Sequence, residues 1–115
     1  MDPLELRIKA YEVASALKMW ERVLNRFCIA CLIEAKAEAE ALAELGLGDI
    51  NMAKRRLEQA REKIATCPAT AYMTELIDYA VKALNKGEYR KAAELIEHIM
   101  DSISAIKPEE LINCL

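Results

Sequence analysis

Apolar residues recur at alternating spacings of three and four in several stretches of this chain, which is the pattern of amphipathic helices. The first stretch runs from Pro3 to about Leu45, and its apolar face is made of Val13, Leu17, Trp20, Leu24, Phe27 and Cys31. The second runs from Asp49 to near Thr66, and its apolar face is made of Ile50, Ala53, Leu57, Ala60 and Ile64. We therefore predict a helix in each of these stretches.

Two further stretches carry the same periodicity, from about Ala69 to Asn85 and from Glu88 to Ile106. Their apolar faces are made of Met73, Leu76, Ala80 and Ala83, and of Tyr89, Ala92, Ile96, Ile99, Ile103 and Ile106. A turn is expected at residues 67–70, because Pro68 ends one helix and can open the next. A short terminal helix is expected after Pro108. The pattern predicts an all-α fold: a single domain over residues 1–115, built as an antiparallel helical-hairpin bundle of four to six helices.

The first stretch contains no glycine or proline after Pro3, so nothing local ends it before Leu45. One straight helix of that length would span roughly 64 Å, far more than the radius of a compact domain of this size. Either the helix breaks or bends near Ile33–Lys36, or it projects and pairs with another subunit; we favour a break or bend.

The segment from Phe27 to Ile33 is apolar all round, and a helix without a polar side must be covered all round. We therefore expect a homo-oligomer or another protein partner. Large desolvated aromatic side chains often anchor interfaces. The predicted interface residues are Trp20, Leu24, Phe27 and Cys31.

A short pattern occurs twice, with an offset of 39 residues: Gly48-Asp49-Ile50-x-x-Ala53 and Gly87-Glu88-Tyr89-x-x-Ala92. Glycine permits the positive φ that ends a helix, the acid suits the start of the next helix, and alanine allows close helix contact. Each copy therefore predicts the corner of a helical hairpin. Other positions coincide at this offset, in the pairs Ala41 and Ala80, Leu45 and Leu84, Leu57 and Ile96, and Ile64 and Ile103.

This spacing resembles the hairpin turn of the tetratricopeptide repeat family, although that family repeats every 34 residues. The second copy matches the family layout at Ala80, Gly87, Tyr89, Ala92 and Pro108, and the first at Gly48, Ala53 and Pro68. The resemblance covers about residues 35–108. It implies binding of a peptide or protein on a concave surface.

Composition narrows the class of protein. Apolar residues make up 54% of the chain and only three glycines and three prolines occur, which excludes a disordered chain. The net charge of −3 argues against a general nucleic-acid binder. No apolar run reaches about 18 residues and no signal peptide pattern opens the chain, so we expect no membrane partner and a cytoplasmic location. Charged residues of both signs reach 30%, a balance seen in thermophile proteins.

Four cysteines, Cys28, Cys31, Cys67 and Cys114, leave three interpretations open. Buried cysteine acts as a small hydrophobe, which fits the apolar surroundings of Cys28-x-x-Cys31. Disulfides could attach Cys67 and Cys114 to the core, although intracellular disulfides are rare outside hyperthermophiles. The third interpretation is a metal or redox protein using all four sulfurs, because Cys-x-x-Cys is a spacing of zinc, iron–sulfur and redox motifs.

Other polar residues give less specific patterns. The only histidine, His98, has no second histidine or catalytic partner, so we expect a solvated surface residue. A basic face on the second stretch is formed by Lys54, Arg55, Arg56, Arg61 and Lys63. A complementary acidic stretch is formed by Glu34, Glu38, Glu40 and Glu44. We expect the basic face to form salt bridges; the alternative is a phosphate-binding surface in a nucleoprotein subunit.

A groove between hairpins, lined by Tyr72, Met73, Tyr79 and Tyr89, is a further candidate, although aromatic residues at helical spacing more often belong to a core. No residue set indicates catalysis or a cofactor. The sequence therefore predicts a non-enzymatic module for protein–protein interaction or self-assembly. The metal or redox protein and the nucleoprotein subunit remain alternatives.

Overall fold

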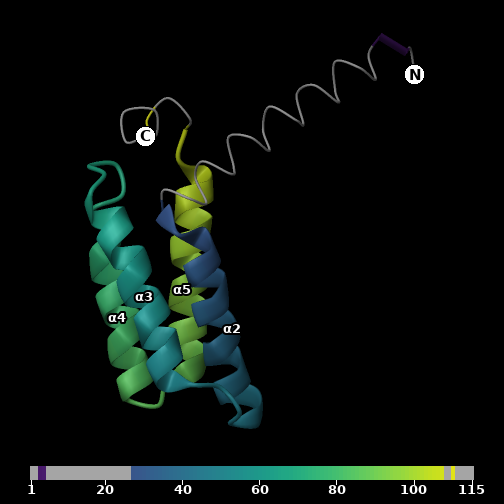
Figure 1. Ribbon diagram of the computed structural model, residues 1–115, viewed down its shortest axis with the longest axis vertical. Helices are drawn as coiled ribbons and strands as arrows, with labels where there is room; N and C mark the ends of the chain where they lie inside the picture. Colours follow the sequence, from purple (N-terminus) through teal and green to yellow (C-terminus); the bar gives the residue numbers. More distant parts are fainter. Residues whose placement is uncertain (1–2, 5–26, 108–109, 111–115) are drawn as a thin grey trace.

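The computed structural model describes residues 3–4, 27–107 and 110. Over these residues the chain forms four long helices and no strand, which confirms the all-α prediction (Figure 1). The helices are α2 (Ile29–Leu45), α3 (Ile50–Ala65), α4 (Met73–Asn85) and α5 (Tyr89–Ala105). None of them combines the length and the apolar character that a membrane crossing requires.

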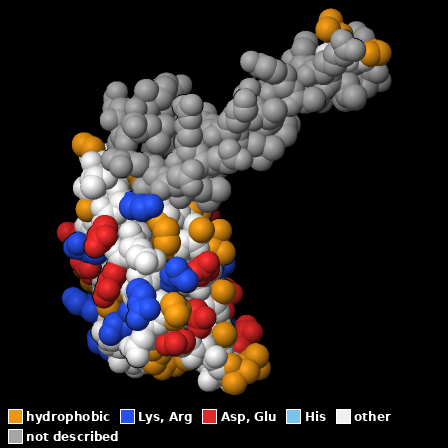
Figure 2. All heavy atoms as spheres, in the orientation of Figure 1, with side chains coloured by type: hydrophobic (Ala, Val, Ile, Leu, Met, Phe, Trp, Pro, Cys, Tyr) orange, Lys and Arg blue, Asp and Glu red, His pale blue; other side chains and the backbone are white. Residues whose placement is uncertain are grey.

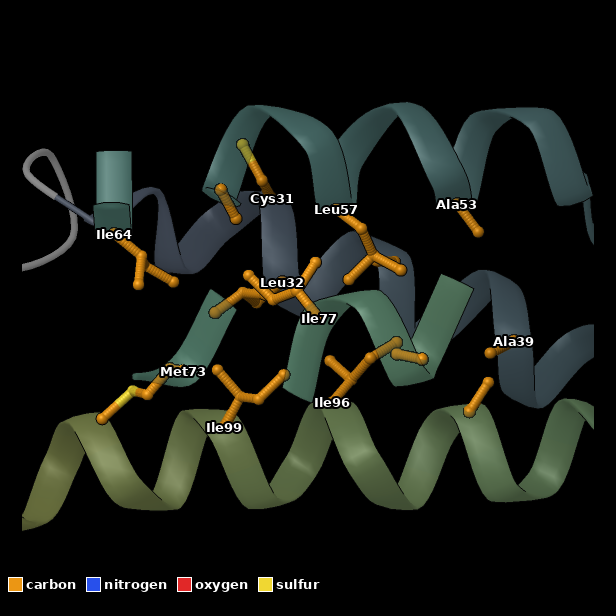
Figure 3. Close-up of a cluster of buried hydrophobic side chains, with 14 of the residues drawn as sticks. Cys31, Leu32, Ala39, Ala53, Leu57, Ile64, Met73, Ile77, Ile96 and Ile99 are labelled. Atoms are coloured by element: carbon orange, nitrogen blue, oxygen red, sulfur yellow. The ribbon is translucent and has the colours of Figure 1, made fainter. Parts of the chain in front are cut away.

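The four helices lie side by side as a bundle in which each packs against two others (Figure 1). Helix α2 packs against α3 and α5, and α4 packs against the same two helices. The core therefore lies along the middle of the bundle. Its larger side chains interleave there, including Leu32 of α2, Leu57 of α3, Ile77 of α4, and Ile96 and Ile99 of α5 (Figure 3).

The buried positions follow the helical periodicity that the sequence shows. On α3 the fully buried residues are Ala53, Leu57, Ala60 and Ile64, the apolar face predicted for that stretch except Ile50 at its edge. Many of the core residues are alanine, namely Ala35, Ala39, Ala53, Ala60, Ala80, Ala83, Ala92 and Ala93. Small side chains at a contact let helix axes approach closely, so long residues such as Leu57 can fill the centre.

The predicted break near Ile33–Lys36 is wrong, because α2 continues through these residues to Leu45. Nothing in that segment opposes a helix, and one face of it is buried through Leu32, Ala35 and Ala39. The helical conformation is interrupted earlier, at Cys28, whose φ of 52° is left-handed. Cys28 is joined to Cys31 by a disulfide.

The α3–α4 connection falls at the predicted turn but is longer than expected, since α4 begins at Met73 rather than near Ala69. Thr70 explains how this segment can be buried. Its side chain is 0% exposed, and its hydroxyl donates to the carbonyl oxygen of Ile64 at 2.8 Å. The connection therefore packs against the end of the core.

The first hairpin corner, between α2 and α3, uses two glycines for two different purposes. Gly46 follows α2 with φ 66°, and its N–H donates to the carbonyl of Leu42 at 3.3 Å. Gly48 has no positive φ, but a Cβ there would overlap the carbonyl oxygen of Glu38 and lie 2.6 Å from Cγ of Leu42. The expectation that Gly48 ends the helix by a positive φ is wrong; Gly46 does so, and Gly48 permits close packing.

The second corner, between α4 and α5, is as predicted. Gly87 has φ 78° and donates its N–H to the carbonyl of Leu84 at 3.2 Å. The next N–H, of Glu88, donates to the carbonyl of Ala83 at 2.9 Å. This pair of hydrogen bonds is the glycine-dependent Schellman ending of a helix.

Candidate interaction surface

The residues predicted as interface anchors lie either in the core or outside the described residues. Phe27 is 0% exposed and Cys31 is 7% exposed. Ile29 and Leu32 in the same run are also buried, whereas Ile33 is 49% exposed. Trp20 and Leu24 lie outside the described residues. Most of the described part of the apolar run is therefore already covered in the single chain.

Disulfides are present, but Cys28 and Cys31 are bonded to each other, a pairing that the sequence does not specify. Cys67 is also disulfide-bonded and is 0% exposed. Cys114 lies outside the described residues. Among the described residues, no three side chains of cysteine, histidine, aspartate or glutamate gather in a way that could hold a metal ion.

The basic face of α3 is partly neutralised by its neighbours. Nε of Arg56 lies 2.7 Å from a carboxylate oxygen of Glu34 on α2, so the predicted acidic stretch does meet the basic face. The guanidinium of Arg61 donates twice to the carboxylate of Asp78 on α4, at 3.0 and 3.3 Å. These two cations are thus engaged in pairs between helices. His98 is exposed, as expected.

Three shallow hollows of the described surface meet at the first half of α5, a convergence that the sequence did not indicate. A hollow of about 340 Å³ lies at its start, between Ala43 and residues 87–91. A second, of about 120 Å³, runs between α2 and α5, and a third, of about 430 Å³, between α4 and α5. The first hollow shares Arg90 with the second and Lys91 with the third. One continuous concave surface therefore wraps around the start of α5.

The flank of this surface toward α2 is acidic. Its hollow is lined by Glu40, Glu44, Glu94 and Glu97, with Arg90 as the one cation of the lining. We call these four glutamates the acidic flank. The carboxylates of Glu40 and Glu97 lie 3.5 and 3.4 Å from Nζ of Lys36.

The pKa of Lys36 reflects the negative charge of this flank. Its partial desolvation alone would lower the pKa of the ammonium group. The carboxylates of Glu97 and Glu40 outweigh that effect, so the pKa of Lys36 lies above its ordinary value of 10.5. The field on this side of α5 therefore favours positive charge.

The flank toward α4 is basic. Its hollow is lined by Lys82, Lys86 and Lys91, with Glu88 as the one carboxylate and with Tyr79, Ala83 and Leu95 between the charges. We call the three lysines the basic flank. Nζ of Lys82 lies 5.7 Å from the centre of the Tyr79 ring, at the distance of a cation–π contact. Tyr79 is 55% exposed, so an aromatic face is available beside the cations. Of the predicted tyrosine groove, the surface thus includes Tyr79 and Tyr89.

Two leucines are exposed at the corner between α2 and α3. Leu45 is 70% exposed and Leu47 is 79% exposed, and Ala43, two residues before Leu45, lines two of the hollows. Hydrophobic side chains gather at the end of the bundle where α2 ends (Figure 2). The end of the bundle at which α2 ends and α5 begins therefore carries exposed apolar side chains.

No known protein family, curated protein or solved structure matches this chain. Among the described residues, the surface around the start of α5 combines concave shape with two oppositely charged sides.

Proposed function

We propose that this protein is a non-enzymatic self-assembly module and that its concave α5 surface binds a second copy of the same chain. The observation that carries the proposal is the placement of the acidic flank and the basic flank on opposite sides of one helix. A surface that holds both charges in parallel strips is complementary to itself, and complementary charge guides and orients association.

Symmetry determines how two copies would meet. Most homodimers have a two-fold axis that brings the same patch of each copy together. If the axis runs parallel to α5, the acidic flank of each copy faces the basic flank of the other, at the same level along the helix. If the axis crosses α5 at right angles, acid faces acid and base faces base. The proposed dimer is therefore the one in which the two α5 helices run parallel.

Apolar groups between and beside the flanks would supply the burial that charge alone does not. Tyr79 and the half-buried Leu95 line the hollow of the basic flank, and Leu45 and Leu47 are exposed at the same end of the bundle. Tyrosine is enriched in interfaces, whereas exposed ion pairs contribute little each and are screened by salt. We expect a dimer that weakens as the salt concentration rises.

The antiparallel arrangement of the hairpins belongs to the same proposal. It is supported by the short corners at residues 46–49 and 86–88 and by the packing of consecutive helices. The resemblance to tetratricopeptide repeats remains a prediction.

Charge reversal tests the proposed pairing. One variant, Lys82→Glu with Lys86→Glu, gives both flanks a net negative charge. A second, Glu44→Lys with Glu94→Lys, gives both a net positive charge, because the two new lysines and Arg90 outnumber the remaining Glu40 and Glu97. None of these four residues takes part in a salt bridge given for the described residues, so the fold should survive. Each variant alone should be monomeric at concentrations where the natural chain is dimeric. An equal mixture of the two should form a heterodimer, because each acidic flank then faces a basic one.

The matched control is Arg55→Glu, an exposed charge reversal on α3, which lines none of the three hollows. It should leave the native mass unchanged. The proposal is wrong if both charge-reversal variants keep the mass of the natural chain, or if their mixture stays monomeric while each remains folded by circular dichroism.

A further inference from the structure

The Cys28–Cys31 disulfide lies where α2 begins, with Cys28 directly before the helix and Cys31 in its first turn. The two Cα atoms are 5.2 Å apart and three positions apart in sequence. A disulfide stabilises a fold mainly by closing a long loop, and a loop this short gains the least. Stabilisation of the fold is therefore a poor explanation for this disulfide.

The bond is also accompanied by an unfavourable backbone conformation. Cys28 has φ 52°, and it is the one non-glycine residue with a positive φ in the described part of the chain. A residue with a Cβ is disfavoured in that region. Reduction would free Cys28 to leave the left-handed conformation. Release of this backbone strain makes reduction of the Cys28–Cys31 bond more favourable than reduction of an unstrained disulfide.

The two sulfurs differ in access, which sets the order of attack. Cys28 is half-buried, whereas Cys31 is only 7% exposed. An external thiolate would therefore reach Sγ of Cys28, and Cys31 would be the leaving group. The helix dipole at the start of α2 stabilises negative charge there, which assists departure of a thiolate.

A polar partner is already in place for the reduced state. Oε1 of Gln59, on α3, lies 3.6 Å from Sγ of Cys31. The sulfur of a disulfide has no hydrogen to donate, whereas a Cys31 thiol can donate to this oxygen. Gln59 is the only glutamine of the chain, so the reduced Cys31 would be held by a specific contact from a neighbouring helix.

From these observations we infer that Cys28–Cys31 is a reversible thiol–disulfide exchange site that reacts with external dithiols. The first thiolate of the dithiol bonds to Sγ of Cys28, and the Cys28–Cys31 bond breaks with its electron pair leaving on Cys31, which takes up a proton. The second thiol of the dithiol then loses its proton and attacks its own mixed-disulfide sulfur, releasing Cys28 as a thiolate. The dithiol is oxidised to a cyclic disulfide by two electrons, and the cysteine pair is reduced by two. This inference does not depend on the proposed dimer.

The test uses the full chain in mixtures of reduced and oxidised dithiothreitol, with free thiols trapped by a maleimide and located by peptide mass mapping. Cys28 and Cys31 should gain and lose the label together and reversibly while the circular dichroism stays that of the folded chain. The built-in control is Cys67, which is disulfide-bonded and fully buried and should stay unlabelled. The inference is wrong if Cys28 and Cys31 become labelled only under conditions that unfold the chain, or only together with Cys67.

Three variants separate the roles of the residues. In Cys31→Ser, the remaining Cys28 thiol should form a mixed disulfide with oxidised glutathione; in Cys28→Ser, the buried Cys31 should react at least about tenfold more slowly. Gln59→Leu should shift the equilibrium toward the disulfide by about threefold, because the reduced thiol loses its acceptor. Equal reactivity of the two single cysteines in folded variants would overturn the assigned order of attack. An unchanged equilibrium in folded Gln59→Leu would remove Gln59 as a positioning residue.

Discussion

The two hairpin corners share a sequence pattern but are built differently. At the first, Gly46 ends α2, and Leu47 and Gly48 follow before Asp49 caps α3 by accepting a hydrogen bond from the N–H of Met52 at 3.1 Å. At the second, Gly87 ends α4 and leads directly into α5, with no side-chain cap at Glu88. The first corner is thus longer and is held by side chains, whereas the second is held by backbone hydrogen bonds.

The repeat therefore specifies the buried face of α3 and α5, the second helix of each pair, but not that of α2 and α4. The equivalent residues Leu57 and Ile96 are both fully buried, as are Ala53 and Ala92. The equivalent leucines before the corners differ, since Leu84 is 1% exposed and Leu45 is 70% exposed. The longer first corner is therefore the one with exposed apolar side chains.

The largest contrast is expected between these two leucines. Leu84→Ala should lower the free energy of unfolding by about 2–5 kcal/mol, because it leaves a cavity in the core. Leu45→Ala should change it by less than about 0.5 kcal/mol, as exposed substitutions usually do. Urea unfolding of both variants measures this, and similar losses at the two positions would contradict the assigned exposure.

The next largest difference in the free energy of unfolding is expected between substitutions of Gly48 and Gly87. Gly48→Ala should cost about 2–3 kcal/mol, because its Cβ would overlap the Glu38 carbonyl and the corner must move. Gly87→Ala should cost only about 1 kcal/mol, since its Cβ meets nothing within 4 Å and the loss comes from the positive φ alone. Thermal unfolding of the two variants ranks them, and a greater loss at Gly87 would refute the distinction.

Substitutions of the acidic residues at the two corners, Asp49 and Glu88, should differ less in their effect on the free energy of unfolding. Asp49→Ala removes the cap of α3 and should cost about 1 kcal/mol. Glu88→Ala removes no cap and should stay within about 0.5 kcal/mol of the natural chain. Chemical denaturation at neutral pH compares them, and equal effects would mean that Asp49 does not act as the cap.

The smallest effect on stability is expected from substitution of Lys36, whose ammonium group on α2 forms a salt bridge with Glu97 on α5. Because its pKa is raised in the folded chain, its contribution is fully present below pH 10.5 and is lost as the pH rises through the folded-state value. The Tm difference between the natural chain and Lys36→Met should therefore be small and constant near neutral pH and should shrink at more alkaline pH. A difference that grows with pH would contradict the raised pKa.

Local periodicity predicted the fold because burial on a helix face follows spacing along the chain. For this reason the spacing of Ala53, Leu57 and Ile64 correctly predicts the buried face of α3. The spacing does not show which neighbour covers each face. Phe27 and Cys31 were therefore assigned to an interface between chains, although both are buried.

The α5 surface could not be predicted for a similar reason. Glu94 and Lys91 belong to opposite flanks only because α2 and α4 lie on opposite sides of the same helix. The state of Cys28 and Cys31 was also left open by their spacing. The bond requires Cys28 to leave the helical conformation, and a sequence pattern does not report that departure.

The native mass of the unmodified chain, measured by sedimentation equilibrium across protein and salt concentrations, tests the central claim most directly. We expect the 12.9 kDa chain to form a dimer at low salt, about 20 mM, and to dissociate as salt approaches about 500 mM. A monomer under all conditions, or a dimer whose mass does not respond to salt, would contradict assembly through the charged flanks of α5.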